Sequence, residues 1–193
     1  VVIAEIMYNP ISGNLDDEYL EFHNRSSAPV DISGWDFVVG IAFSFPTNAI
    51  TQNMPAGAYW VMAKNPDNLF LIYTNLNTNN TFGPYTGTLA NGGERVVLAS
   101  VDYDRVSNNG TNVIEELPVP VSDVSYDDGG KWGFWSDGQG SSLELIDVEA
   151  DGHHPSNWAD SSDTGESRWT AIEATVPLGE SLGTNVNDSL IVM

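Results

Sequence analysis

The strongest constraint on the fold of this chain is a two-residue alternation of apolar and polar side chains near its beginning. Within residues 18–37, EYLEFHNRSSAPVDISGWDF, the apolar Leu20 and Phe22 alternate with Glu21 and His23. This period of two is typical of a strand with one buried face and one wet face. We therefore expect residues 18–23 to form a strand whose Leu20 and Phe22 point into a core.

Short apolar segments of the same kind recur along the chain, and Gly, Pro, Asn and Asp separate them. No long segment has the 3.6-residue period of a helix, although residues 68–73 suit one short helical turn. We expect strands at residues 1–8, 37–45, 58–63, 94–100, 113–117, 121–126 and 142–146. The segments 113–117 and 121–126 form either two strands or one strand interrupted by Pro118 and Pro120, and residues 102–112 are expected to be a polar excursion. Roughly eight or nine short strands between turn signals predict an all-β protein of the sandwich class.

The net charge of the chain restricts the classes of molecule that it can bind. Asp and Glu number 27 against 6 Lys and Arg, so the formal net charge is −21. The resulting negative field repels phosphate backbones, which argues against nucleic acid and anionic membrane surfaces as partners. No apolar run is long enough to cross a bilayer, so we expect no membrane insertion. Divalent cations, cationic partners or solubility in salt fit this charge better.

Several passages together resemble one known family. They are residues 5–10 (EIMYNP), 18–37, 82–98 (FGPYTGTLANGGERVVL), 124–147 and 155–158 (PSNW). In this order they resemble the lamin tail domain family, in the form found in bacterial secreted proteins. The resemblance implies an immunoglobulin-like β-sandwich at the cell surface or outside the cell. It also implies that the other domains of the same polypeptide are partners.

The resemblance ends before the chain does. We expect residues 1–162 to form the lamin-tail-like sandwich. We interpret residues 163–193 as a linker and the first strands of a truncated neighbouring β-domain. A β-tail that pairs with an edge of the sandwich fits residues 163–193 equally well.

One acidic loop suggests a cation site. Asp147, Glu149 and Asp151, followed by Gly152, have the spacing of the first half of a calcium loop. The twelfth position is a Trp instead of the bidentate Glu that such loops need, so Asp160 or a backbone carbonyl would have to complete the site. Calcium is therefore the candidate cofactor, and a metal-free structural loop is the alternative. A second acidic cluster, at residues 16–18, is interpreted as a solvated loop. His153 and His154, which follow Asp151 in the sequence, are interpreted as part of an exposed polar loop.

The densest group of aromatic side chains is a candidate ligand site. Trp132, Phe134 and Trp135 lie close together in a glycine-rich segment. If they are exposed, they could stack on sugar rings or bind a protein; otherwise they pack beneath a loop. Trp35 and Trp158 are assigned to the core.

Two acidic side chains in the apolar strands need partners. Glu5 and Glu21 fall on adjacent expected strands, where Arg25 or Arg95 could neutralise one of them. The alternative is a carboxylate pair for acid–base catalysis. The Ser, His and Asp residues match no known hydrolase motif.

We therefore expect no enzyme but a structural, adhesive or interaction module of a larger bacterial protein. The alternatives are a carbohydrate-binding module and a calcium-stabilised spacer domain.

Overall fold

The structure is a computed structural model that describes residues 1–47, 52–108, 111–161, 174–176 and 188–190. The chain divides into two compact units, Val1–Ser161 and Ser162–Met193. In the second unit, β13 (Ala174–Val176) pairs antiparallel with β14 (Asp188–Leu190). The expected domain boundary after residue 162 and the truncated neighbouring domain stay predictions. Everything below concerns the first unit.

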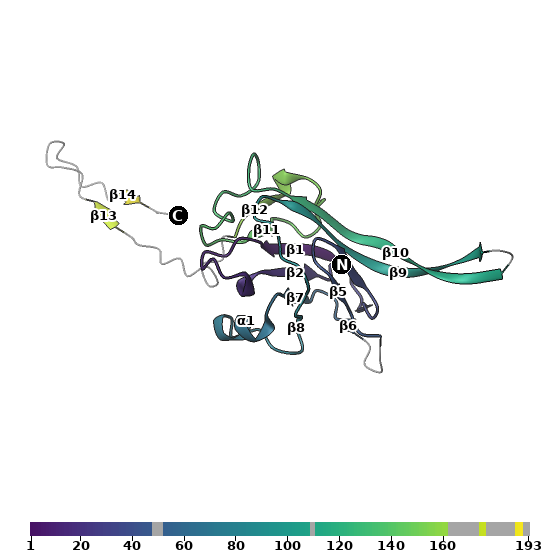
Figure 1. Cartoon of the computed structure of the whole chain (residues 1–193). Coiled ribbons are helices and arrows are strands. Elements are labelled where there is room, and N and C mark those ends of the chain that lie inside the picture. The colour runs from purple at the N-terminus through teal and green to yellow at the C-terminus, as the bar shows by residue number, and fades with distance from the viewer. Residues whose placement is uncertain (48–51, 109–110, 162–173, 177–187, 191–193) are drawn as a thin grey trace. The chain divides into compact units, whose positions relative to one another are not determined.

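Two sheets form the first unit (Figure 1). The six-stranded sheet has the order β12 (Trp158–Asp160), β11 (Leu143–Leu145), β1 (Val2–Met7), β2 (Tyr19–His23), β7 (Tyr59–Ala63) and β8 (Thr81–Phe82). The four-stranded sheet has the order β10 (Thr111–Tyr126), β9 (Glu94–Asn108), β4 (Asp36–Val39) and β5 (Phe43–Ser44). A small ribbon pairs β3 (Val30–Asp31) with β6 (Asn53–Met54). Apart from the parallel pair of β7 and β8, neighbouring strands are antiparallel.

The core lies between the two sheets. Leu20 and Phe22 of β2 are fully buried, as the alternation predicts. They pack in one apolar cluster with Phe37, Val96 and Leu98 of the second sheet. A layer of interdigitated side chains from two facing sheets is the defining feature of a β-sandwich, and the expected fold class is confirmed.

The other face of β2 is also covered over part of its length. His23, expected on a wet face, is only 7% exposed, because its ring stacks on Tyr59 at 4.1 Å between centroids. Tyr19 packs with Leu69 of α1 (Pro66–Ile72). The helix begins where the side chain of Asn65 caps it and Pro66 occupies the first turn. The helical turn expected at residues 68–73 is thus part of a seven-residue helix. Two short 3₁₀ turns, η1 (Leu15–Asp17) and η2 (Pro155–Asn157), complete the helical elements of the described residues.

The longest strands of the described residues are β9 and β10, and their far halves leave the sandwich (Figure 1). We call residues 94–100 and 119–126 the base of this ribbon and residues 101–118 its arm. In the base, Val96, Leu98 and Val124 are at most 1% exposed. In the arm, the side chains described at residues 102–104 and 114–118 are all exposed. The polar excursion expected at residues 102–112 was therefore the wrong interpretation, since strand structure is continuous over most of it.

Candidate functional site

The aromatic candidates divide into a buried ring and an exposed pair. Trp132 is partly buried, and its ring lies 6.2 Å from that of the core residue Trp158. Phe134 is 69% exposed and Trp135 is 39% exposed. Their rings contact each other edge to face, with centroids 5.5 Å apart and planes at 84°. Thus Phe134 and Trp135 form a small aromatic surface, and Trp132 belongs to the packing beneath it. Trp35, which we assigned to the core, is only partly buried against it.

A short network of hydrogen bonds fixes the turn that carries this aromatic pair. The Asp160 carboxylate accepts a hydrogen bond from the backbone N–H of Ser136 at 2.7 Å, and the Ser136 hydroxyl donates to the Gly133 carbonyl at 2.9 Å. A Cβ at Gly133 would lie 2.3 Å from the Asp160 carboxylate, so only glycine fits there. Asp160, one of the four candidate metal ligands, therefore acts as an anchor for the aromatic turn.

The other three candidate ligands lie in the loop after β11. The carboxylate of Asp147 accepts a hydrogen bond from the N–H of Glu149 at 2.9 Å. Asp151 accepts from the N–H of His153 at 3.0 Å and pairs with the ring of the same residue at 2.7 Å. These contacts with His153 lower the pKa of Asp151. In the described part of the chain, no three His, Asp or Glu side chains gather closely enough to hold a metal ion. The calcium site at Asp147, Glu149, Asp151 and Asp160 stays a prediction.

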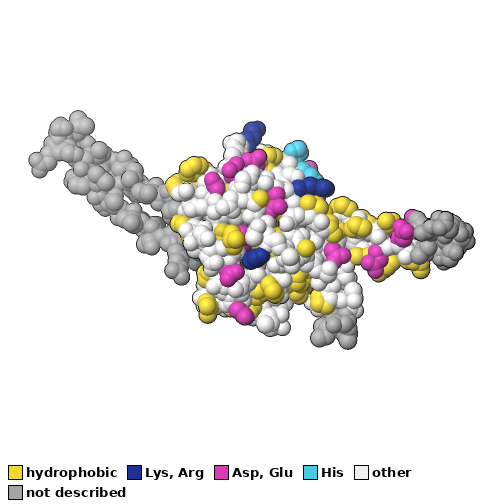
Figure 2. Space-filling model, viewed as in Figure 1, with side chains coloured by type: hydrophobic (Ala, Val, Ile, Leu, Met, Phe, Trp, Pro, Cys, Tyr) yellow, Lys and Arg dark blue, Asp and Glu magenta, His cyan; other side chains and the backbone are white. Residues whose placement is uncertain are grey.

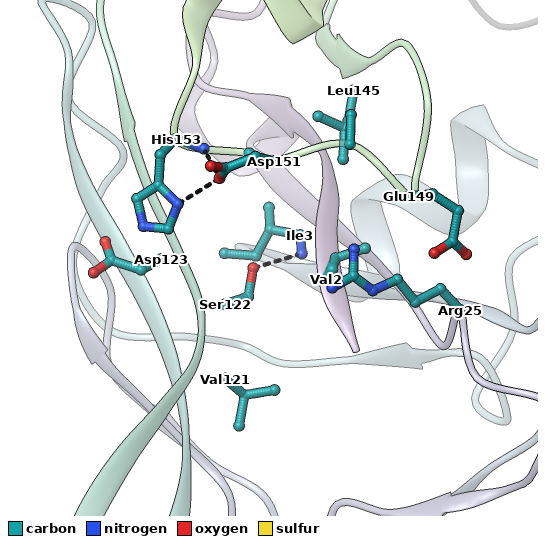
Figure 3. A pocket seen from close by; sticks show the side chains of 12 residues that line it. Val2, Ile3, Arg25, Val121, Ser122, Asp123, Leu145, Glu149, Asp151 and His153 are labelled. Atoms are coloured by element: carbon teal, nitrogen blue, oxygen red, sulfur yellow. Dashed lines mark hydrogen bonds and ion pairs between the residues drawn. The ribbon is translucent and has the colours of Figure 1, made fainter.

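This acidic loop forms one wall of a cleft of about 260 Å³ (Figure 3). The opposite wall is the base of β10, at Val121, Ser122 and Asp123, and the start of β1 lies at the bottom. The backbone N–H of Ile3 donates to the Ser122 hydroxyl at 2.9 Å, which joins the bottom of the cleft to the β10 wall.

Charged groups of both signs line the rim of the cleft. Arg25 is held by a hydrogen bond from its Nη1 to the Val148 carbonyl at 3.2 Å. Asp123, a lining residue, has a lowered pKa because Arg95 donates to its carboxylate. His153 and His154 are both exposed, and both rings lie near the Asp151 carboxylate. This agrees with the interpretation of the two histidines as part of an exposed polar loop. The cleft is thus lined by three carboxylates, those of Asp123, Glu149 and Asp151, and by one guanidinium, that of Arg25.

Glu5 is buried and takes its hydrogen bonds from hydroxyl groups. It is 8% exposed, and its carboxylate accepts a hydrogen bond from Tyr19 at 2.6 Å and another from Ser142. It lies directly opposite Glu21 in the ladder between β1 and β2. Of the two arginines considered as its partners, Arg95 pairs with Asp123 at 2.5 Å. Glu5 therefore ties β1 to β2 and to the segment before β11.

Glu18 corrects the interpretation of residues 16–18 as a solvated loop. It is fully buried, and its Oε2 accepts hydrogen bonds from the Tyr85 hydroxyl at 2.9 Å and the Leu89 N–H at 3.0 Å. Its Oε1 has no hydrogen-bond partner, and burial raises the pKa of Glu18. Glu18 shares the parity of Leu20 and Phe22, so the alternation already placed it on the inner face.

The geometry defines an immunoglobulin-like β-sandwich. Its two buried carboxylates among the described residues are those of Glu5 and Glu18. Its two exposed surfaces are the aromatic pair of Phe134 and Trp135 and the arm of β9 and β10. Comparison with known families agrees with this fold. The family model of the lamin tail domain matches residues 1–115, and the chain belongs to that family. An immunoglobulin-like domain of this kind is consistent with a non-catalytic interaction module. No curated protein and no solved structure matches the chain.

Proposed function

We propose that this chain is a non-catalytic interaction module of a larger secreted or cell-surface bacterial protein, and that it contacts another protein through the arm of β9 and β10. The observation that carries the proposal is the exposure of apolar side chains along the arm: Tyr103 is 64% and Ile114 67% exposed, and Leu117 and Val119, which ends the base, are each 43% exposed. In the register of the ribbon, Leu117 and Val119 lie on one face and Tyr103 and Ile114 on the other. Exposed apolar patches mark interaction surfaces.

The arm contributes little to the stability of the sandwich, which supports a role in binding. A two-stranded ribbon is marginally stable by itself in water, so its ordering entropy has to be offset by packing. In the base, Leu98 and Val124 supply that packing. In the arm, no described side chain belongs to either apolar cluster. A partner that covers the arm would supply the missing contacts.

The environment of the carboxylates supports a non-catalytic role. Glu5, one of the two acids of the catalytic pair considered from the sequence, is buried and held by protein groups, and so is Glu18. General acid–base catalysis requires a side chain within hydrogen-bond reach of a substrate. Glu5 and Glu18 hold segments of the sandwich together instead.

No helix in the described part of the chain is long and apolar enough to cross a membrane.

A photo-crosslinking experiment tests the proposal. A photoreactive amino acid replaces either Leu117 or Tyr103 in the full-length parent protein, which is irradiated in its own cells. The matched control places the same group at Leu71 of α1, which is 85% exposed. We expect a protein adduct from Leu117 or Tyr103 and none from Leu71. The proposal fails if neither arm position gives an adduct beyond that of Leu71.

The exposed aromatic pair favours a second candidate function, carbohydrate binding through Phe134 and Trp135. Aromatic rings exposed on a rigid turn can stack on the apolar face of a sugar. Trp132 is partly buried and packs on Trp158, so the proposed platform consists of Phe134 and Trp135 alone. A glycan array distinguishes this candidate. Binding that disappears in both Phe134→Ala and Trp135→Ala, while Leu71→Ala binds normally, would establish it.

A further inference from the structure

We infer that the partner of the arm presents a cationic amphipathic strand, with Lys or Arg alternating with apolar side chains, to the face that carries Leu117 and Val119. This inference rests on the proposed function, because it names the chemistry of the partner that the arm binds. It follows from the register of the ribbon, the prolines of β10 and the distribution of charge.

The register assigns the side chains of the ribbon to two faces. Directly paired residues of antiparallel strands lie on the same face, and so do residues two apart in one strand. The core residues Val96 and Leu98 therefore share a face with the pairs farther along β9. These pairs are Ser100 with Val119, Asp102 with Leu117, and Asp104 with Glu115. We call this set the acidic face of the ribbon.

The acidic face continues the inner face of the sandwich but lacks a second layer. In the base, the six-stranded sheet covers Val96 and Leu98. Beyond the pair of Ser100 and Val119, the described side chains of this face are exposed. The inner faces of sandwich sheets normally pack against another layer. A partner strand laid over the acidic face would supply that layer.

The prolines of β10 disfavour the pairing of a partner strand along one of the two edges of the ribbon. β10 is an edge strand, and edge strands invite pairing with other chains. Pro118 and Pro120 lie opposite Val101 and Ala99. A proline is tolerated in a ladder where its nitrogen points away from the neighbouring strand, so both remove donors from the open edge of β10. Strand addition along the β10 edge of the arm is thereby disfavoured.

The charges on the acidic face select a cationic partner. Asp104 lies directly opposite Glu115 in the ladder. With Asp102 they give the face three carboxylates beside two aliphatic side chains. A Lys or Arg of the partner would be attracted to Asp102 and Glu115 on this face. A second copy of the chain is repelled, because each copy has a net charge of −21.

The opposite face of the arm has a different composition and serves as an internal control. It carries the pairs Val101 with Pro118, Tyr103 with Glu116 and Arg105 with Ile114. Its one acid, Glu116, is accompanied by Arg105, so this face does not have the negative charge of the acidic face. The two faces can therefore be tested separately within one arm.

The experiment measures binding of three short peptides to the full chain. The probe alternates lysine and valine; one comparison peptide alternates glutamate and valine, and the other lysine and serine. We expect the lysine–valine peptide to bind about tenfold more tightly than either comparison peptide, which corresponds to about 1.4 kcal/mol. Its affinity should fall as salt rises, because surface charges are screened.

Matched variants locate the bound peptide. We expect Leu117→Ser to weaken binding about tenfold, whereas Leu71→Ser and Tyr103→Ser leave it unchanged. The double variant Asp102→Asn with Glu115→Gln should weaken binding similarly. Its control, Asp67→Asn with Asp128→Asn, removes the same number of charges from exposed positions outside the ribbon. Unchanged melting temperatures show that each variant folds.

Each other outcome overturns the inference. Equal weakening by both double variants would mean that the general negative field binds the peptide. Weakening by Tyr103→Ser but not by Leu117→Ser would assign the opposite face. Self-association that Leu117→Ser abolishes would identify a second copy as the occupant. If the peptides fail but photo-crosslinking at the arm succeeds, the proposed function stands and only the partner's chemistry is wrong.

Discussion

The base and the arm of β9 and β10 are parts of the same two strands, yet they meet different surroundings. In the base, Val96, Leu98 and Val124 are enclosed by the opposite sheet. In the arm, Tyr103 is 64% and Ile114 67% exposed. Figure 2 shows hydrophobic side chains at the surface of this part of the molecule. The ladder continues across the boundary with one irregularity, between Pro120 and Ser122.

The base therefore contains residues whose burial stabilises the fold, whereas the arm contains residues that are exposed and can bind a partner. Burial of apolar area is the dominant favourable term in folding, so the base is where substitutions should be most destabilising. The arm adds backbone pairing and little burial. Its sequence is therefore free to serve binding, and the predictions below test that separation.

The largest effect is expected from removing a core side chain in the base. Leu98→Ala creates a cavity and should lower the free energy of unfolding by about 2–5 kcal/mol. Leu117→Ala in the arm removes the same atoms from an exposed site and should change it by about 0.5 kcal/mol or less. Urea unfolding of both variants measures this contrast. Equal losses would show that the arm is part of the cooperative core.

The effect of calcium on thermal stability would show whether the acidic loop beside the base binds a cation. If the loop of Asp147, Glu149 and Asp151 binds calcium with Asp160, saturation at about a hundred times Kd adds roughly 2.7 kcal/mol to stability. Each kcal/mol raises Tm by about 2–4 °C for a chain of this size.

The measurement for calcium is a thermal unfolding curve in EDTA and in calcium, with magnesium as the control for screening. The calcium-specific rise should disappear in Asp151→Asn and persist in the arm variant Asp102→Asn. Overlaid curves would contradict the site and leave solubility as the role of the acidic loop.

Removing the buried Glu18 carboxylate should cost about 1–3 kcal/mol. Glu18→Ala leaves the Leu89 N–H without its acceptor, and the loss of a buried partner has that cost. Far-ultraviolet circular dichroism during urea unfolding measures it. The exposed arm residue Glu115 is the matched control, and Glu115→Ala should have little effect.

Glu18 also predicts a pH dependence of the stability of the sandwich. Because burial raises its folded-state pKa, the folded chain keeps a proton that the unfolded chain loses above pH about 4.3. The stability it contributes at lower pH is therefore lost as pH rises through the raised pKa. Glu18→Gln should flatten the stability curve in that window. An unchanged slope would mean that Glu18 is ionised in the folded chain.

The smallest effect is expected from removing the arm. Replacing residues 101–118 by an Asn-Gly turn connects Ser100 to Val119, which already face each other in the ladder. Tm should stay close to that of the full chain, and binding of the lysine–valine peptide should be lost. A large fall in Tm would show that the arm contributes to the stability of the sandwich, which would contradict the proposed difference between base and arm.

Alternation and turn residues were sufficient to predict the sandwich. Strands expected at residues 1–8, 58–63 and 142–146 correspond to β1, β7 and β11. These strands bury one face, which produces the two-residue period. The family followed from short passages in the expected order.

The arm was missed because nothing buries either of its faces. Without burial, Asp102, Tyr103 and Asp104 show no apolar period, and the segment resembles a polar loop. The sequence does carry one signal: Asn109-Gly110 lies between the end of β9 and the start of β10, and Asn-Gly strongly favours a hairpin. Glu18 was misassigned because the neighbouring acids suggested a solvated cluster.

Amide hydrogen exchange, with and without the lysine–valine peptide, tests the separation of base and arm most directly. Core strands exchange through global unfolding, whereas weakly packed segments open locally. We predict that the base amides of Val96 to Leu98 are strongly protected in the free chain. The arm amides from residue 101 onward should exchange much faster and gain protection when the peptide binds. Equal protection of arm and base in the free chain, or no change in the arm with bound peptide, would contradict the account.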